Sequence, residues 1–313
     1  MWTTTAESLL LYCQTRPALY CKNFAWTLNV RRIGIFYHPL KQEACNLARE
    51  AAEFLRERHL AVWLCSAWDW EWGRPQVDGT DLVLTIGGDG TILRAAQAIM
   101  PRAVPITGIN LGRLGFTTEL TVSEAMEKLT EILEEKGTVE ERAVLEADLI
   151  TGGAKEPKRL YALNDVVIAR GGTARLVNIE ARIDGAPLTT LRADGVVLAT
   201  ATGCTGYALA AGGPILHPLS RDFVMVPILA HLSYGFPMVL PQTSVTSLAL
   251  CLPTPGLLSI DGHINMDLAC GDVVTVKQSP NTVRFLRIHE TNFYESLEQR
   301  LKGKQPGDAR RES

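Results

Sequence analysis

The chain has 313 residues, enough for two domains that each bury a substantial core. Its 31 Lys and Arg residues nearly balance 34 Asp and Glu residues. We therefore expect neither nucleic acid nor a membrane surface as a partner. The seven cysteines form no C-x-x-C pair, which favours free thiols in a reducing compartment and predicts a cytoplasmic protein. The six histidines show no zinc-ligand spacing, and no apolar run is long enough to cross a bilayer.

Residues 1–29 differ in character from the rest of the chain. The run Leu9-Leu10-Leu11 is too short for the core of a signal peptide, and no basic segment precedes it. We predict that this segment is a disordered leader and that the functional chain begins near Val30.

From residue 30 to residue 138, apolar runs alternate with segments of helical periodicity. Strands are predicted at Ile33–Tyr37, Ala61–Cys65, Leu82–Ile86 and Val104–Ile109. Helices are predicted over Ala44–Leu55, after residue 91, and over Ser123–Lys136, the last capped by Ser123 and closed by Gly137. This alternation predicts an α/β domain with a Rossmann-like open parallel sheet, whose ligands bind at the carboxyl ends of the strands.

Three tryptophans, Trp68, Trp70 and Trp72, follow the second predicted strand. Their rings have the shape to stack on a nucleotide base, but the pattern favours a partly buried loop.

Residues 139–290 change to short runs of Val, Ile, Leu and Thr separated by turn signals such as Asp184-Gly185 and Asp261-Gly262. This pattern predicts an all-β domain, a sandwich of antiparallel strands. Residues 291–313 are predicted to form a helix from Asn292 to about Leu301, which closes the fold, and then a frayed tail.

The segment Gly87-Gly88-Asp89-Gly90-Thr91 joins the third strand to the following helix. Glycines allow close approach of the backbone to a ligand, and free N–H groups at a helix start favour phosphate. A carboxylate beside phosphate is unfavourable unless it accepts a proton or faces a cation. Asp89 is therefore a candidate kinase base, the alternative being an ordinary turn in which Asp caps the helix. Neither a Walker loop nor a G-x-G-x-x-G motif is present.

Three further polar stretches follow in order. The segment Asn110–Phe116 comes after the fourth strand, at the same sheet edge as Asp89. Asn164 and Asp165 interrupt an apolar strand, so they need either a ligand or a structural partner. The stretch Thr202–Pro214 is rich in small and hydroxyl residues, which suits close approach to a flat ligand.

In this order the motifs resemble those of the NAD kinase family, from Ile33 to about Leu301. The resemblance implies Mg²⁺-dependent transfer of a phosphoryl group from ATP or polyphosphate to the 2′-hydroxyl of the adenosine ribose of NAD, giving NADP. It implies that Asp89 is the proton acceptor, and it suggests a homodimer or homotetramer joined through the β domain.

The same resemblance implies a set of binding residues, for which no separate metal ligand is identified. These are Gly88, Gly90, Thr91, Asn110, Phe116, Asn164, Asp165, Arg175, Arg192, Asp194, Thr205, Gly206, Tyr207, Ala208, Leu209, Ala210 and His263. Arg113 is a further candidate for phosphate charge.

The chain departs from the family pattern at several positions. Cys204 replaces a usual Ser, Gly206 an Ala and His263 a Gln, while Leu229-Ala230-His231 and Phe236-Pro237 replace Cys-Pro-His and Arg-Pro. A thiol is a weaker hydrogen-bonding group than a hydroxyl, and the arginine is lost as a charged group. The departures leave the proposed base intact, but what the resemblance implies about affinity, phosphoryl donor and regulation does not carry over at these positions. A nucleophilic Cys204 is an alternative, but no base is paired with it in the sequence.

Two other functions remain open. A lipid or sphingoid-base kinase shares the aspartate turn but would need an apolar acyl pocket. A non-catalytic relative that binds NAD(H) or NADP(H) as a sensor would tolerate the departures, but retention of Asp89 argues against it.

Overall fold

The computed structural model describes residues 23–25, 30–112, 115–134, 136–152, 154, 156–172, 175–231, 235–251, 254–289, 293–294 and 297. Arg113, most of the predicted leader and most of the predicted final helix lie outside this set. Within the predicted leader, Asn23–Ala25 form β1, which pairs antiparallel with β7 (Thr138–Arg142).

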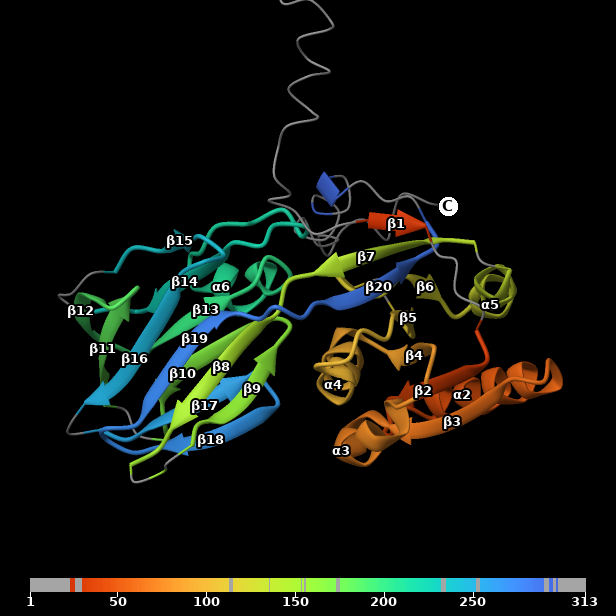
Figure 1. The fold of residues 1–313 in the computed structure, drawn as a ribbon, viewed down its shortest axis with the longest axis horizontal. Helices are drawn as coiled ribbons and strands as arrows, with labels where there is room; N and C mark the ends of the chain where they lie inside the picture. The colour runs from red at the N-terminus through yellow and green to blue at the C-terminus, as the bar shows by residue number, and fades with distance from the viewer. Residues whose placement is uncertain are drawn as a thin grey trace, which may run out of the picture.

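The N-terminal part is built on an eight-stranded sheet with the order β1-β7-β20-β5-β4-β2-β3, and β6 pairs with β5 (Figure 1). Its other strands are β2 (Arg32–Tyr37), β3 (Ala61–Ser66), β4 (Leu82–Gly87), β5 (Ile106–Asn110), β6 (Leu120–Thr121) and β20 (Val283–Arg287). Strands β2 to β6 pair in parallel, and β20 continues this direction beside β5. The α/β class with a parallel sheet is confirmed.

Helices cover both faces of this sheet. They are α2 (Gln42–Glu57), α4 (Asp89–Ile99) and α5 (Ala125–Leu133), with the short turns η1 (Ala67–Asp69), α3 (Trp70–Gly73) and η2 (Arg74–Val77). α2 and α5 share one apolar cluster with the sheet, whereas α4 lies in another. Every residue of β4 is buried, as expected for a parallel strand covered on both sides.

The C-terminal part is an antiparallel β-sandwich, which confirms the predicted class. One sheet has the order β15-β14-β13-β10-β17-β18 and the other β12-β11-β16-β19-β8-β9. The strands are β8 (Leu145–Ile150), β9 (Lys158–Ala162), β10 (Asp165–Arg170), β11 (Val177–Ile183), β12 (Ala186–Ala193), β13 (Gly195–Ala199), β14 (Phe223–Ile228), β15 (Met238–Leu240), β16 (Val245–Cys251), β17 (Gly256–Ile260), β18 (Ile264–Leu268) and β19 (Val273–Gln278). Apolar residues of both sheets form one core between them.

Two strands from the range predicted as β-rich belong instead to the N-terminal sheet. β7 and β20 pair with each other there, and β20 also pairs with β5. Local strand patterns identify strands but do not reveal which sheet they join. The chain therefore enters the sandwich through β7 and returns from it through β20.

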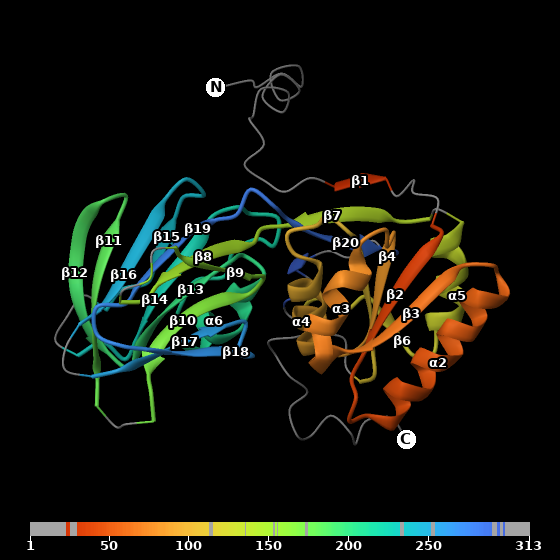
Figure 2. The ribbon, with the colours of Figure 1, turned by 60° about the horizontal axis from the view of Figure 1, so that its bottom comes forward.

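The two parts pack beside each other, with α4 on the side of the first that faces the sandwich (Figure 2). Gln97 of α4 donates through Nε2 to the Tyr161 carbonyl at 2.5 Å and to Asp261 Oδ2 at 3.2 Å. Leu163 lies in the same apolar cluster as Ile99. The helix that begins at Asp89 is thereby fixed to the β domain.

Two local predictions differ from the structure. α5 begins at Ala125 with Glu124 as its N-cap, so Ser123 is not the cap. Glu124 Oε1 accepts the backbone N–H of Thr121 at 2.7 Å, which ties the helix start to β6. Of the tryptophans, Trp68 and Trp72 are exposed and Trp70 is partly buried, on short helical turns rather than an irregular loop.

The return strand β20 predicts a stability effect. Phe285 is buried beside residues of both parts, so Phe285→Ala should lower the free energy of unfolding by about 3–5 kcal/mol. Leu40→Ala, at a residue 73% exposed, is the control and should change it by less than about 0.5 kcal/mol. Chemical denaturation measures both, and equal effects would contradict this role for β20.

Candidate active site

Asp89 is the first residue of α4, directly after the carboxyl end of β4. Gly87, the last residue of β4, pairs with Asn110, the last residue of β5. Because parallel strands end at one edge, the Asp89 turn and the Asn110 loop lie together. This is the edge where open α/β sheets bind ligands.

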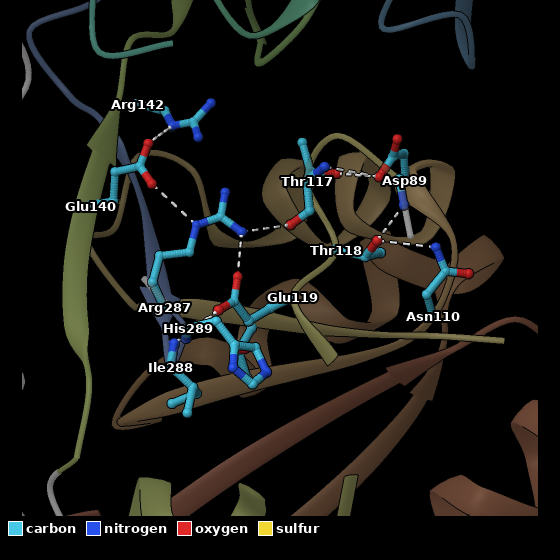
Figure 3. Close-up of polar contacts among 12 residues, drawn as sticks. Asp89, Asn110, Thr117, Thr118, Glu119, Glu140, Arg142, Arg287, Ile288 and His289 are labelled. Carbon is cyan, nitrogen blue, oxygen red and sulfur yellow. Dashed lines mark hydrogen bonds and ion pairs between the residues drawn. The ribbon is translucent and has the colours of Figure 1, made fainter. Parts of the chain in front are cut away.

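Three donors from one loop hold the Asp89 carboxylate (Figure 3). Oδ2 accepts the Phe116 N–H at 3.0 Å, and Oδ1 accepts the Thr117 N–H at 3.1 Å and the Thr117 hydroxyl at 2.6 Å. An ionised carboxylate has about four lone-pair sites. Among the described contacts three are used, so Oδ2 keeps one direction in which to accept a proton.

The glycines around Asp89 fall into two kinds. A Cβ on Gly115 would lie 2.2 Å from Asp89 Oδ1, so the carboxylate needs a glycine at that position. A Cβ on Gly88 or Gly90 would meet nothing within 4 Å. Packing within the chain therefore does not require glycine at these two positions, whereas a ligand lying against the backbone would.

The remaining residues of this edge support the loop. Asn110 donates through Nδ2 to the Thr118 hydroxyl at 3.0 Å and accepts the Gly112 N–H at 3.0 Å through Oδ1. Thr118 also accepts the Gly115 N–H at 2.8 Å. Thr91 is buried, and a Cβ on Gly87 would lie 2.1 Å from its Oγ1. Its side chain therefore packs against the turn.

A second constellation surrounds the buried carboxylate of Asp261. It accepts the backbone N–H groups of Leu163, Asn164 and Asp165 at 3.0, 2.7 and 3.1 Å, in addition to Gln97. Asp261 thus fixes the backbone of the candidate pair Asn164–Asp165 and connects it to α4. Its own carbonyl lies 3.0 Å from His263 Nδ1.

Several polar groups in this constellation lack partners. Asn164 Oδ1 and His263 Nε2 are buried atoms with no hydrogen bond in the described part of the chain. Burial and then the negative charge of Asp261 raise the pKa of Asp165 to about 7. Buried groups without partners are unfavourable, so a ligand that supplies hydrogen bonds would relieve this cost.

The small-residue stretch packs against the same strand. A Cβ on Gly203 would lie 2.1 Å from the Asn164 carbonyl oxygen, which shows how closely the two backbones approach. The candidates after it lie on η3 (Gly203–Thr205) and α6 (Tyr207–Ala210). Of these, Gly206, Tyr207 and Ala210 are exposed, Thr205 and Leu209 half-buried, and Ala208 buried.

Cys204 is structural in this arrangement. It is fully buried, and its Sγ accepts the Leu216 N–H at 3.2 Å. Burial raises the pKa of the Cys204 thiol, which disfavours the thiolate that a nucleophile requires. Burial and the raised pKa therefore argue against the alternative of a nucleophilic Cys204.

Arg175, Arg192 and Asp194 are not brought to this site. Asp194 pairs with Arg170 at 3.1 Å, at the end of β10 opposite Asp165. Five residue steps along the strand separate its two ends by about 17 Å. Arg192 and Arg175 are exposed near the same end of the sandwich as Asp194.

Several residues that hold this site are not candidates in the sequence, because their partners are distant in the chain. They are Gln97, Thr117, Glu119, Asp261 and Arg287. The one signal was a charged residue in an apolar context, as for Arg287 at the end of Val283–Leu286.

No group of three or more His, Cys, Asp or Glu residues is placed to hold a metal ion in the described residues. Likewise, no described helix is long and apolar enough to span a bilayer.

The two kinds of glycine predict opposite effects. Gly115→Ala forces the Asp89 carboxylate off its donors and should lower the free energy of unfolding by about 1–3 kcal/mol. An added Cβ at Gly90 meets nothing within 4 Å beyond the neighbouring backbone of α4, so Gly90→Ala should raise the free energy of unfolding by up to about 1 kcal/mol through helix propensity. Thermal unfolding without ligand measures both, and a loss of stability in Gly90→Ala would show that packing requires this glycine.

Comparison with known proteins identifies the family. Residues 68–137 match the ATP-NAD kinase N-terminal domain and residues 163–288 the ATP-NAD kinase C-terminal domain. The chain is 42% identical over 274 residues to an NAD kinase of Dehalococcoides mccartyi, covering 87% of this chain and 96% of that protein. It is 40% identical over 274 residues to an NAD kinase of Chloroflexus aurantiacus, covering 87% and 99%.

Solved structures agree. Yeast NADH kinase, complexed with NADH, superposes with a TM-score of 0.78 at 25% identity, covering 90% of this chain and 89% of that one. An NAD kinase from Archaeoglobus fulgidus in complex with ATP has the same fold, with a TM-score of 0.66 at 24% identity, covering 82% and 94%. The chain that carries the Asp89 turn and the Asn164–Asp165 strand belongs to the NAD kinase family.

Proposed function

We propose that this chain is an NAD kinase that transfers the terminal phosphoryl group of ATP to the 2′-hydroxyl of the adenosine ribose of NAD. The observation that carries the proposal is the Asp89 carboxylate, which is fixed by three donors and keeps one lone pair at Oδ2. It lies between Gly88 and Gly90, where an added Cβ would meet nothing within 4 Å. Membership of the family supports the same reaction.

Asp89 accepts the proton of the attacking hydroxyl in this mechanism. The proton moves from the ribose oxygen to Oδ2 as that oxygen attacks the phosphorus, and the nucleoside diphosphate leaves. A general base of this kind contributes about 10²–10⁴-fold to the rate. The remaining acceleration comes from holding the two substrates in line.

The turn before α4 is suited to the phosphates of the donor. Gly88 and Gly90 offer backbone without side-chain obstruction, and no side chain caps the first N–H groups of α4. Asn110 and Phe116 keep the facing loop in place rather than needing direct contact with phosphate.

The acceptor dinucleotide binds along the constellation around Asp261. Asn164 Oδ1 and the Asp165 carboxylate accept hydrogen bonds from hydroxyl or amino groups, and His263 Nε2 offers another contact. Exposed residues of the stretch from Thr205 to Ala210 cover the ligand's flat surface. Each unsatisfied group then gains a partner on binding.

Mg²⁺ is proposed as a companion of the nucleotide. Mg²⁺ commonly binds through one or two carboxylates and substrate phosphates, so the absence of a three-ligand cluster in the described residues fits such an ion. When bound, it would neutralise phosphate charge, held by the nucleotide phosphates rather than by Asp89, whose remaining lone pair takes the proton.

Four finer expectations remain proposals. Polyphosphate is an alternative donor, a homodimer or homotetramer is the expected assembly, and the expected location is the cytoplasm. Arg175, Arg192 and Asp194 are further NAD contacts in this proposal, although within one chain they lie away from Asp165.

The two alternative functions have less support. The relatives compared above are NAD or NADH kinases, and none is a lipid kinase. A sensor would not need a carboxylate with a lone pair held open beside the turn.

Replacing the base tests the reaction. Asp89→Asn keeps the shape and one of the two acceptor oxygens but cannot take a proton, so kcat for NADP formation should fall by about 10²–10⁴-fold. NAD affinity, measured by calorimetry, should stay within about threefold of wild type. Unchanged turnover in folded Asp89→Asn would reject the base role, and an inactive wild type would reject the kinase.

Asp165 predicts a pH effect on stability. Its pKa in the folded chain is about 7, above the ordinary value, so the folded state holds its proton more tightly. Stability contributed by the protonated form is present at low pH and is lost as pH rises from about 4 to about 7.

Asp165→Asn removes this penalty. The variant should melt at a higher temperature than wild type at pH 8, with a difference that shrinks toward pH 5, while NAD affinity falls. Asp148→Asn, at an exposed ion pair on β8, is the control for a charge change. A melting difference independent of pH would contradict the assigned titration.

A further inference from the structure

Two arginines and two glutamates form a chain of ion pairs behind the Asp89 loop (Figure 3). Glu119, Arg142 and Arg287 are 5%, 6% and 9% exposed, and Glu140 is also largely shielded. They come from the segment before β6, from β7 and from β20. Nothing in the motifs of the family resemblance assigned a role to any of them.

Arg287 is the centre of this cluster. Its Nη1 donates to Glu119 Oε2 at 2.9 Å and to the Thr117 carbonyl at 3.3 Å, and its Nε donates to Glu140 Oε2 at 3.1 Å. Thr117 is the residue whose N–H and hydroxyl hold Asp89. Thr117 therefore connects the Arg287 guanidinium to the Asp89 carboxylate.

Glu119 holds the other side of the same loop. Its Oε1 accepts the backbone N–H groups of Ile288 and His289 at 2.9 and 2.8 Å, while Oε2 faces Arg287. The Glu119 carboxylate therefore connects this part of the loop, two residues after Thr117, to the backbone that follows β20. The loop is therefore held at the Thr117 carbonyl by Arg287, and at the Glu119 side chain by the N–H groups of Ile288 and His289.

The cluster also reaches the β domain. Glu140 Oε1 accepts a hydrogen bond from Arg142 Nε, and Arg142 Nη1 donates to the Thr202 hydroxyl at 3.3 Å. Thr202 opens the small-residue stretch proposed to cover NAD. The same set of ion pairs thus contacts both the loop of the base and the start of the dinucleotide stretch.

The charges in the cluster balance, which makes its burial tolerable. Burial favours the neutral guanidinium, but Glu140 and Glu119 outweigh it and raise the pKa of Arg287. Burial opposes ionisation of Glu140, but Arg142 and Arg287 outweigh it and lower its pKa. Removing one partner would leave a buried charge uncompensated, so all four members act together.

Resting on the kinase function proposed above, we propose that Arg287 is a positioning residue: through the Thr117 carbonyl and Glu119 it holds the loop whose donors orient Asp89. The planar guanidinium makes three contacts in fixed directions, which a lysine ammonium cannot reproduce. Arg287 itself touches neither substrate. Its effect is on the turnover of bound substrates rather than on their binding.

The test compares Arg287→Lys with Arg284→Met, a variant on the same strand whose residue pairs with Glu141 at the partly exposed surface. In Arg287→Lys, kcat for NADP formation should fall by about 10- to 100-fold, with KM for NAD and ATP within about threefold. Arg284→Met should keep wild-type kcat. A kcat of Arg287→Lys within twofold of wild type would overturn the proposal.

A second readout does not depend on activity. Amide hydrogen exchange of residues 115–119 should be roughly tenfold faster or more in Arg287→Lys, and unchanged in Arg284→Met, because the loop opens locally. Unchanged exchange there overturns the proposal even if the wild-type chain proves inactive. Wild-type inactivity with faster exchange would reject the kinase function alone.

Glu119→Gln covers the case in which Arg287→Lys does not fold. The amide keeps an oxygen for the Ile288 and His289 N–H groups but loses the ion pair with Arg287. It should show the same kcat loss and faster exchange of the loop. Wild-type kcat and exchange in folded Glu119→Gln would overturn the proposal.

Discussion

The site depends on how one carboxylate is held. Asp89 stands at the start of a helix, where its position is set by donors that lie 27 and 28 residues further along the chain. Those donors are two backbone N–H groups and one hydroxyl, so no ion pair among the described residues orients the carboxylate. Gly115 leaves the space that this contact needs. A carboxylate held in this way stays near the backbone proposed to bind phosphate, while one lone pair remains to accept a proton.

The second constraint is the connection between the two parts of the fold. Asp261 accepts hydrogen bonds from three consecutive backbone N–H groups, those of residues 163–165, and from the side-chain amide of Gln97 on α4. The helix that begins at Asp89 is thereby connected to the strand proposed to bind NAD. On the other side of the site, Arg287 and Glu140 connect the Asp89 loop to Thr202 through Arg142. Phosphoryl transfer requires the attacking oxygen, the phosphorus and the leaving oxygen to lie in line. In the proposed mechanism, these two connections hold the residues that position the substrates.

Sequence patterns predicted most of the fold because they are local. Helical periodicity located α2, and the buried run before Asp89 located β4, within one or two residues. The same patterns assigned β7 and β20 to the wrong sheet, since strand propensity carries no information on pairing partners. At the site, Asp89, Asn164 and Asp165 stood out as polar residues in glycine-rich or apolar settings. Glu119 and Arg287 did not stand out, because they are 168 residues apart and only the folded structure shows that they form an ion pair.

The most direct measurement is a crystal structure of the chain with NAD and a non-hydrolysable ATP analogue. The account predicts that the 2′-hydroxyl oxygen of the adenosine ribose lies about 2.6–3.2 Å from Asp89 Oδ2, with the terminal phosphate of the analogue against Gly88 and Gly90. A ribose bound more than about 5 Å from Asp89, or a nucleotide bound at another edge of the sheet, would contradict it, since no proton could then pass directly between them.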